Sequence, residues 1–211
     1  MIYAENVLVC IAVPLAVSLL FTKGDSRRLM ASFLAGMVVC ILSAYVAGYL
    51  KMISGFSSED TSVFLSPITE ECFKLLSVLF CIYAYDPSDD EVQLLSVGIG
   101  AGFATFENCC LVLSAGAGEL AYVLTRGSVV GVMHIVTLVA LAKGLSLLKK
   151  YRALSLAGIT GILSISVTVH GLYNLLVSEP GMPSYIGYAM PMLCAIVLYM
   201  ASFVKKNKPS F

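Results

Sequence analysis

Seven long apolar stretches, separated by short polar linkers, dominate this chain. A helix that crosses a bilayer needs about 20 mostly apolar residues, and each stretch approaches or exceeds that length. The stretches span residues 3–22, 29–50, 64–85, 92–115, 127–148, 153–177 and 185–204. Only 12% of the 211 residues are charged, against about 25% in an average soluble domain. We therefore expect an all-α, polytopic bundle of about seven transmembrane helices, which excludes a soluble or a disordered fold.

Lys and Arg are distributed unevenly over the linkers, and this asymmetry predicts an orientation. If the amino terminus lies outside, only Lys51 and Arg126 fall on the outer side. The cytoplasmic side then receives Lys23, Arg27, Arg28, Lys143, Lys149, Lys150, Arg152, Lys205, Lys206 and Lys208. We expect a multi-pass protein of the cell membrane with its carboxyl terminus in the cytoplasm. The linkers are too short for a second domain, so residues 1–211 should form a single transmembrane domain. The net charge of zero gives no basic excess for nucleic acid.

Six ionisable residues lie inside the expected spans and away from the span ends, where they are costly. They are Glu70, Glu71, Lys74, Glu107, His134 and His170. A charged side chain at the centre of a membrane helix costs about 2.5–3.5 kcal/mol on insertion scales. Such residues persist when they satisfy one another and serve a function.

The depth of these residues in the membrane predicts that they meet. Glu70 and Glu71 lie roughly 10 Å below the outer end of the third span, at a rise of 1.5 Å per residue. Glu107 and His134 lie roughly 12 Å below the outer ends of the next two spans. His170 lies roughly 10 Å below the outer end of the sixth span. Four helices thus place ionisable groups at one level, in the outer third of the bilayer.

The residue types at this level are typical of a metal-dependent hydrolase. Glu107, His134 and His170 form a His₂Glu set, which is common in catalytic zinc sites with a position open for water. The cofactor we expect is a divalent metal, with Zn²⁺ first. Glu70 or Glu71 would then act as the general base, and the sequence leaves open which of them does so. A metal-free mechanism, in which Glu and His activate water directly, also stays open.

Two further residues share helical faces with this set. Lys74 follows Glu70 by four residues and Glu71 by three, so it can pair with a carboxylate as a counter-ion. Asn174 follows His170 by four residues and could donate a hydrogen bond to the oxyanion of a tetrahedral intermediate. The pairs Gly98-x-x-x-Gly102 and Gly127-x-x-x-Gly131 are expected to pack the fourth and fifth spans closely.

These residues occur in motifs that resemble the PrsW family of intramembrane metalloproteases, within the wider group of CAAX prenyl proteases and Abi proteins. EExxK occupies residues 70–74, FxxxE residues 103–107 and HxxxN residues 170–174, with His134 between the last two. The resemblance covers residues 64–177, the expected catalytic core. It implies that Glu70 and Glu71 are the essential acidic pair, and that Glu107, His134 and His170 complete the site.

The resemblance also implies a substrate and a position of cleavage. PrsW proteins make a first cut, on the extracytoplasmic side, in a membrane-anchored anti-sigma factor. The expected partner is therefore a single-span membrane protein, cleaved near the outer face. Two other functions remain to be weighed. Buried Glu and His also mark proton or cation carriers, and a silent scaffold would need none of the four intact motifs.

Overall fold

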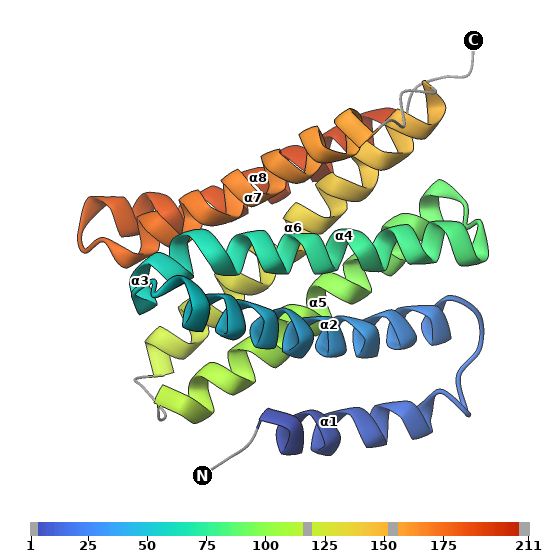
Figure 1. Ribbon diagram of the computed structural model, residues 1–211. Coiled ribbons are helices and arrows are strands. Elements are labelled where there is room, and N and C mark those ends of the chain that lie inside the picture. Colours follow the sequence, from blue (N-terminus) through green and yellow to red (C-terminus); the bar gives the residue numbers. More distant parts are fainter. Residues whose placement is uncertain (1–3, 116–119, 152–155, 207–211) are drawn as a thin grey trace.

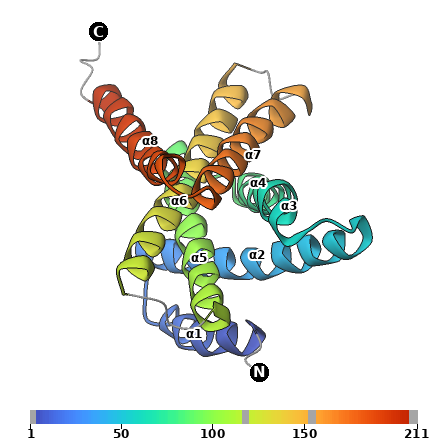
Figure 2. The same ribbon diagram turned by 90° about the vertical axis from the view of Figure 1, so that its left-hand side faces the viewer.

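The computed structural model describes residues 4–115, 120–151 and 156–206, and this part of the chain is helical throughout, apart from short turns. Its elements are α1 (Ala4–Ser18), α2 (Gly24–Ser54), α3 (Ser58–Asp60), the π-helical turn η1 (Thr61–Leu65), α4 (Ser66–Tyr85), α5 (Asp89–Ala115), α6 (Leu120–Lys150), α7 (Leu156–Ser178) and α8 (Met182–Lys206). The long helices run alongside one another (Figure 1). Seen along the bundle, α4 and α5 lie near its centre, and α1 and α8 lie at its margins (Figure 2).

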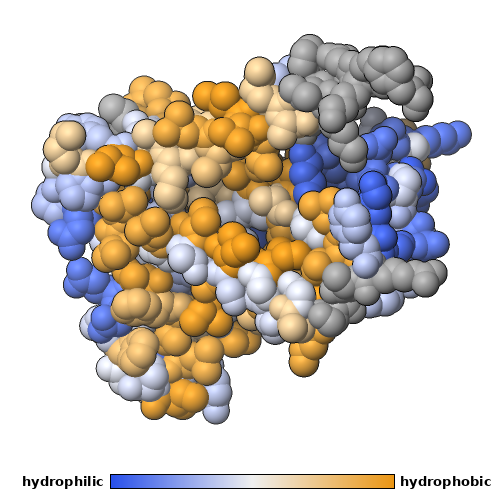
Figure 3. All heavy atoms as spheres, turned by 90° about the horizontal axis from the view of Figure 1, so that it is seen from above, coloured by the Kyte–Doolittle hydropathy of each residue, from blue (hydrophilic) through white to orange (hydrophobic). Residues whose placement is uncertain are grey.

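The surface and the helix lengths agree with a protein that crosses a membrane several times. Apolar residues gather over the middle of the bundle, and hydrophilic residues gather at its two ends (Figure 3). Among the described residues, five helices are long and apolar enough to span: α2, α5, α6, α7 and α8. Helix α1 has only 15 residues, and α4 carries Glu70, Glu71 and Lys74 within its 20. The multi-pass fold is confirmed, whereas seven spans and the orientation stay predictions.

Glycines set the contact between α2 and α5, which is the closest in the bundle. A Cβ atom on Gly36 would overlap the backbone of Ile99, and one on Gly102 would overlap the backbone of Phe33. The prediction that Gly98 and Gly102 pack the fourth span against the fifth is wrong. Both residues face α2, and it is Gly100 that faces α6, where a Cβ would lie 2.9 Å from the Cα of Ile135.

The second pair, Gly127 and Gly131, does not make the expected contact either. A Cβ atom on each would find no neighbour within 4 Å. A small-residue motif permits close approach but does not say which helix approaches. Here the α5 glycines serve two neighbours, because they occur on two faces of the helix and α5 lies between α2 and α6.

Replacing Gly102 by Ala should therefore destabilise the bundle. The added methyl group needs space that the α2 backbone occupies, and overpacking of this kind costs about 1–3 kcal/mol. Unfolding in mixed detergent micelles measures the change. Gly131→Ala is the matched control, since its methyl group meets open space. Equal stability of the two variants would contradict this account of the helix contact.

Candidate active site

The six ionisable residues expected to meet do so, in one network between four helices. Helix α4 contributes Glu70, Glu71 and Lys74, α5 contributes Glu107, α6 contributes His134, and α7 contributes His170. The rings of the two histidines lie edge to face, with their centroids 5.2 Å apart. The prediction that these groups share one level is thus supported by their contacts.

Glu71 is fully buried and its carboxylate is surrounded by donors. Its Oε1 atom accepts hydrogen bonds from Lys74 Nζ at 2.8 Å and from His170 Nδ1 at 2.9 Å. Its Oε2 atom accepts one from the Ser166 hydroxyl at 2.7 Å. Because the carboxylate only accepts, His170 carries its proton on Nδ1 and keeps the Nε2 lone pair free. Glu71 therefore orients His170 in the way that carboxylates orient metal-binding histidines, by accepting a hydrogen bond from the ring nitrogen that does not face the metal.

A second chain of contacts runs from Lys74 through His134 to Glu107. Lys74 Nζ lies 2.6 Å from His134 Nδ1, and His134 Nε2 lies 2.6 Å from Glu107 Oε2. With an ammonium group at one side and a carboxylate at the other, a neutral His134 carries its proton on Nε2. The ammonium group also lies 4.4 Å from the centre of the Phe103 ring, a favourable cation–π distance.

Glu70 differs from the other two carboxylates because one of its oxygens has no partner. The Oε2 atom is buried and makes no hydrogen bond to any residue that the structure describes. It lies 3.7 Å from His170 Nε2, and the side chain is 15% exposed. A buried oxygen of this kind costs free energy unless something binds it.

Two residues of the network were not predicted as site residues. Ser166 precedes His170 by four residues, so helical spacing places it on the same face of α7. Arg126 precedes His134 by two helical turns, and its Nη2 atom lies 3.6 Å from Glu107 Oε1. From the sequence, Arg126 is expected only in the outer linker. Both residues could have been found by asking which polar side chains share a face with the two histidines.

Asn174 makes a contact that its expected role does not require. Its Nδ2 atom donates a hydrogen bond of 2.8 Å to the backbone carbonyl of Ser62, in η1. The amide thus links α7 to the turn that precedes α4. A role at the oxyanion stays a prediction.

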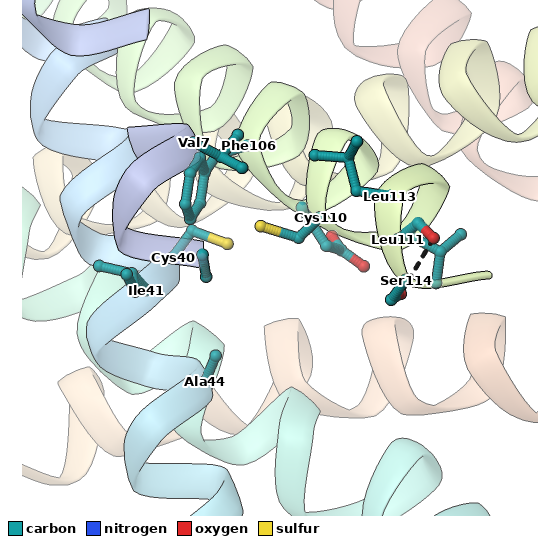
Figure 4. Close-up of a pocket in the computed structure, with 11 residues that line it drawn as sticks. Val7, Cys40, Ile41, Ala44, Phe106, Cys110, Leu111, Leu113 and Ser114 are labelled. Atoms are coloured by element: carbon teal, nitrogen blue, oxygen red, sulfur yellow. Dashed lines mark hydrogen bonds between the residues drawn. The ribbon is translucent and has the colours of Figure 1, made fainter. Parts of the chain in front are cut away.

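A groove leads to the site between α1, α2 and α5. Its volume is about 720 Å³, and apart from Ser114 and two cysteines its lining is apolar until it reaches Glu107. Cys40 on α2 and Cys110 on α5 point into it from opposite sides (Figure 4). Glu107 is 30% exposed, whereas Glu71, Lys74 and His134 are completely buried. The groove therefore reaches the network at Glu107.

Comparison with known protein families agrees with this geometry. The family model described as PrsW family intramembrane metalloprotease matches residues 25–202, from the start of α2 into α8. The chain belongs to the PrsW family. The match contains all the motifs from which the resemblance was inferred. Comparison with curated proteins and with solved structures gave no match.

A PrsW-family metalloprotease implies a divalent metal, and the donors present fit one. Glu70, His134 and His170 each offer a ligand atom, and these atoms lie within 4.8 Å of one another. The partnerless oxygen of Glu70 and the free Nε2 of His170 are what a metal site needs. The carboxylate ligand in this set is Glu70, whereas the sequence predicted Glu107 in that role. Both nitrogens of His134 are hydrogen-bonded, so its ligation would replace one of those contacts.

Proposed function

We propose that this protein is an intramembrane endopeptidase that hydrolyses a peptide bond of a single-span membrane protein near the outer face. The observation that carries this proposal is the partnerless Glu70 oxygen, which faces the free nitrogen of His170 inside a buried Glu/His/Lys network. A network that only joined helices would leave no carboxylate oxygen unsatisfied. The family match supports the same reaction class.

The groove supports a polypeptide substrate that enters from the side. Its apolar lining suits a segment that comes from the membrane, and Glu107, the charged residue of that lining, suits peptide groups that need polar partners. A transmembrane helix hides its amides in its own hydrogen bonds, so the substrate must unwind locally before cleavage. By resemblance to the family, the natural substrate is similar to an anti-sigma factor.

The residues around the site divide the chemistry among them. Zn²⁺ held by Glu70, His134 and His170 would supply Lewis-acid polarisation at this position. Glu107, the carboxylate reached from the groove, takes a proton from the attacking water at Oε1. It then delivers that proton to the amine nitrogen as the C–N bond breaks. Arg126 balances the negative charge of Glu107.

Two alternatives within this class are kept. In the first, Glu107 is the ligand, as the sequence predicted, and Glu70 is the base, one of the two glutamates that the sequence left open for that role. In the second, the carboxylates and imidazoles activate water with no metal. Metal analysis of the Glu70 and Glu107 variants distinguishes the first alternative from the proposed assignment. Activity in a strong chelator would support the second.

A proton or cation carrier receives no support from the contacts. A carrier needs polar groups that lead from its site to both faces of the membrane. Beyond Lys74 and His134, towards the end of the bundle that holds the α4–α5 turn, α4, α5 and α6 meet in an apolar cluster. Its buried members are Leu75, Val78, Val92, Ile99, Leu138, Leu141, Ala142 and Leu145. This cluster closes the path on that side of the site.

The test is cleavage of a single-span reporter protein reconstituted in the same vesicles. Glu107→Gln should lower kcat by roughly 10²–10⁴-fold, the usual contribution of a general acid–base group. Glu59→Gln, the same change on the short α3 helix outside the network, is the control and should leave kcat unchanged. Full cleavage by Glu107→Gln would overturn its assignment as the base. Ion flux without cleavage by the wild-type protein would overturn the proposed function.

A further inference from the structure

The turn that precedes α4 is π-helical, and this leaves one of its backbone carbonyls without the usual donor. In η1 the Ser66 N–H bonds to the carbonyl of Thr61, five residues back, rather than to that of Ser62. In a π-helical pattern the next donor for Ser62 would be residue 67, but residue 67 is a proline and has no N–H. The Ser62 carbonyl therefore needs a partner from outside the helix.

Asn174 on α7 supplies that partner. Its Nδ2 atom donates to the Ser62 carbonyl at 2.8 Å. Beside it, Gly171 allows α7 to approach, because a Cβ there would lie 3.0 Å from the Val63 carbonyl oxygen and 3.9 Å from Pro67 Cγ. One turn before Asn174, His170 binds Glu71. Residues 170–174 of α7 thus lie against η1 at Ser62 and Val63 and against the start of α4 at Glu71.

We propose that Asn174 is a positioning residue that clamps η1 to α7 and so sets the separation of Glu70 from His170. This inference rests on the proposed function, since that separation matters only if the two side chains act together. Ser62 is exposed on the bundle, so where its carbonyl faces lipid no water replaces the lost amide, and a different turn geometry becomes more favourable. Glu70 follows the last residue of η1 by five positions, so a changed turn moves it relative to His170. The expected oxyanion role is the competing assignment.

A double-mutant cycle between Asn174 and Pro67 distinguishes the two assignments. Asn174→Ala should lower kcat by about 10–100-fold, the usual effect of losing a contact that holds a metal ligand in position. In a Pro67→Ala background, residue 67 regains an N–H that can bond within the helix, so Asn174→Ala should then cost less than about threefold. An equal loss in both backgrounds would overturn the clamp, because an oxyanion donor acts on the substrate regardless of residue 67. Thr168→Ala, an exposed position on α7, is the control and should leave kcat unchanged.

Two readouts keep the inference independent of proteolysis and of the folding of the Pro67 variant. Asn174→Ala alone should speed amide hydrogen exchange in residues 61–70 by about tenfold or more, because the turn loses its anchor. It should also weaken Zn²⁺ binding by about 10–100-fold, measured by competition with a chromophoric chelator. Unchanged exchange would overturn the clamp whether or not the protein is a protease. Faster exchange in a protein that cleaves no reporter would uphold the clamp and contradict the proposed function.

Discussion

Glu70→Gln is expected to lower kcat for reporter cleavage by roughly 10²–10⁴-fold, with the fold intact. The substitution keeps the shape of the side chain and removes its charge. It acts on a side chain whose buried Oε2 atom makes no hydrogen bond to any described residue, so it should disturb no internal hydrogen bond of that atom. Cleavage kinetics in vesicles measure the loss, and the thermal unfolding midpoint, expected to stay unchanged, shows that the bundle is preserved.

Metal analysis of the same variant assigns the carboxylates. Purified wild-type protein should hold about one divalent ion, and Glu70→Gln should lose it. Glu107→Gln, with the same change in a carboxylate 30% exposed to the groove, should keep the ion while losing activity. The reverse result would restore Glu107 as the ligand and Glu70 as the base. Loss of the ion from neither variant, with activity retained in a strong chelator, would favour the metal-free mechanism.

Lys74→Met is expected to lower the free energy of unfolding by about 3–5 kcal/mol, the usual effect of removing one partner from a buried ion pair. Both members of the pair are completely buried, at an Nζ–Oε1 distance of 2.8 Å. Without Lys74, the charge of Glu71 keeps only neutral donors. Unfolding in mixed detergent micelles measures the effect, which should be larger than that of Gly102→Ala.

The double variant Glu71→Gln/Lys74→Met should recover most of this loss, because it removes both charges together. It should not recover cleavage, since His170 loses the carboxylate that orients it and His134 loses its contact with Lys74. If the double variant were as unstable as Lys74→Met alone, the uncompensated charge would not be the cause. If it regained full cleavage, Glu71 and Lys74 would have no role beyond stability.

The sequence predicted the helices and the level of the site, because both follow from distances along a helix. Apolar lengths predicted seven stretches, and each overlaps one long helix of the part of the chain that the structure describes. The rise per residue brought Glu70, Glu107, His134 and His170 to one depth. The same reasoning could not decide the rotation of each helix about its axis. That rotation places Glu70 beside both histidines and leaves Glu107 at the groove.

The remaining differences come from contacts that leave weak signals in a sequence. Gly98 and Gly102 predict that another helix packs closely against α5, but only the fold shows that this helix is α2. Ser166 is unremarkable by residue type, and only its spacing from His170 points to the site. The π-helical turn precedes Pro67, which has no N–H to offer the Ser62 carbonyl, and Asn174 on α7 satisfies that carbonyl instead. Such a pairing between distant segments cannot be read from local patterns.

The apolar cluster formed by α4, α5 and α6 has a consequence for an energised membrane. Hydrolysis inside a bilayer requires water at the reacting bond, and a water column that crossed the whole bilayer would conduct protons and dissipate the electrochemical gradient. The buried members of this cluster lie between the network and the end of the bundle that holds the α4–α5 turn, so their hydrocarbon side chains oppose a continuous water column from the site towards that end. We therefore expect the site to admit water without opening a proton path through that end.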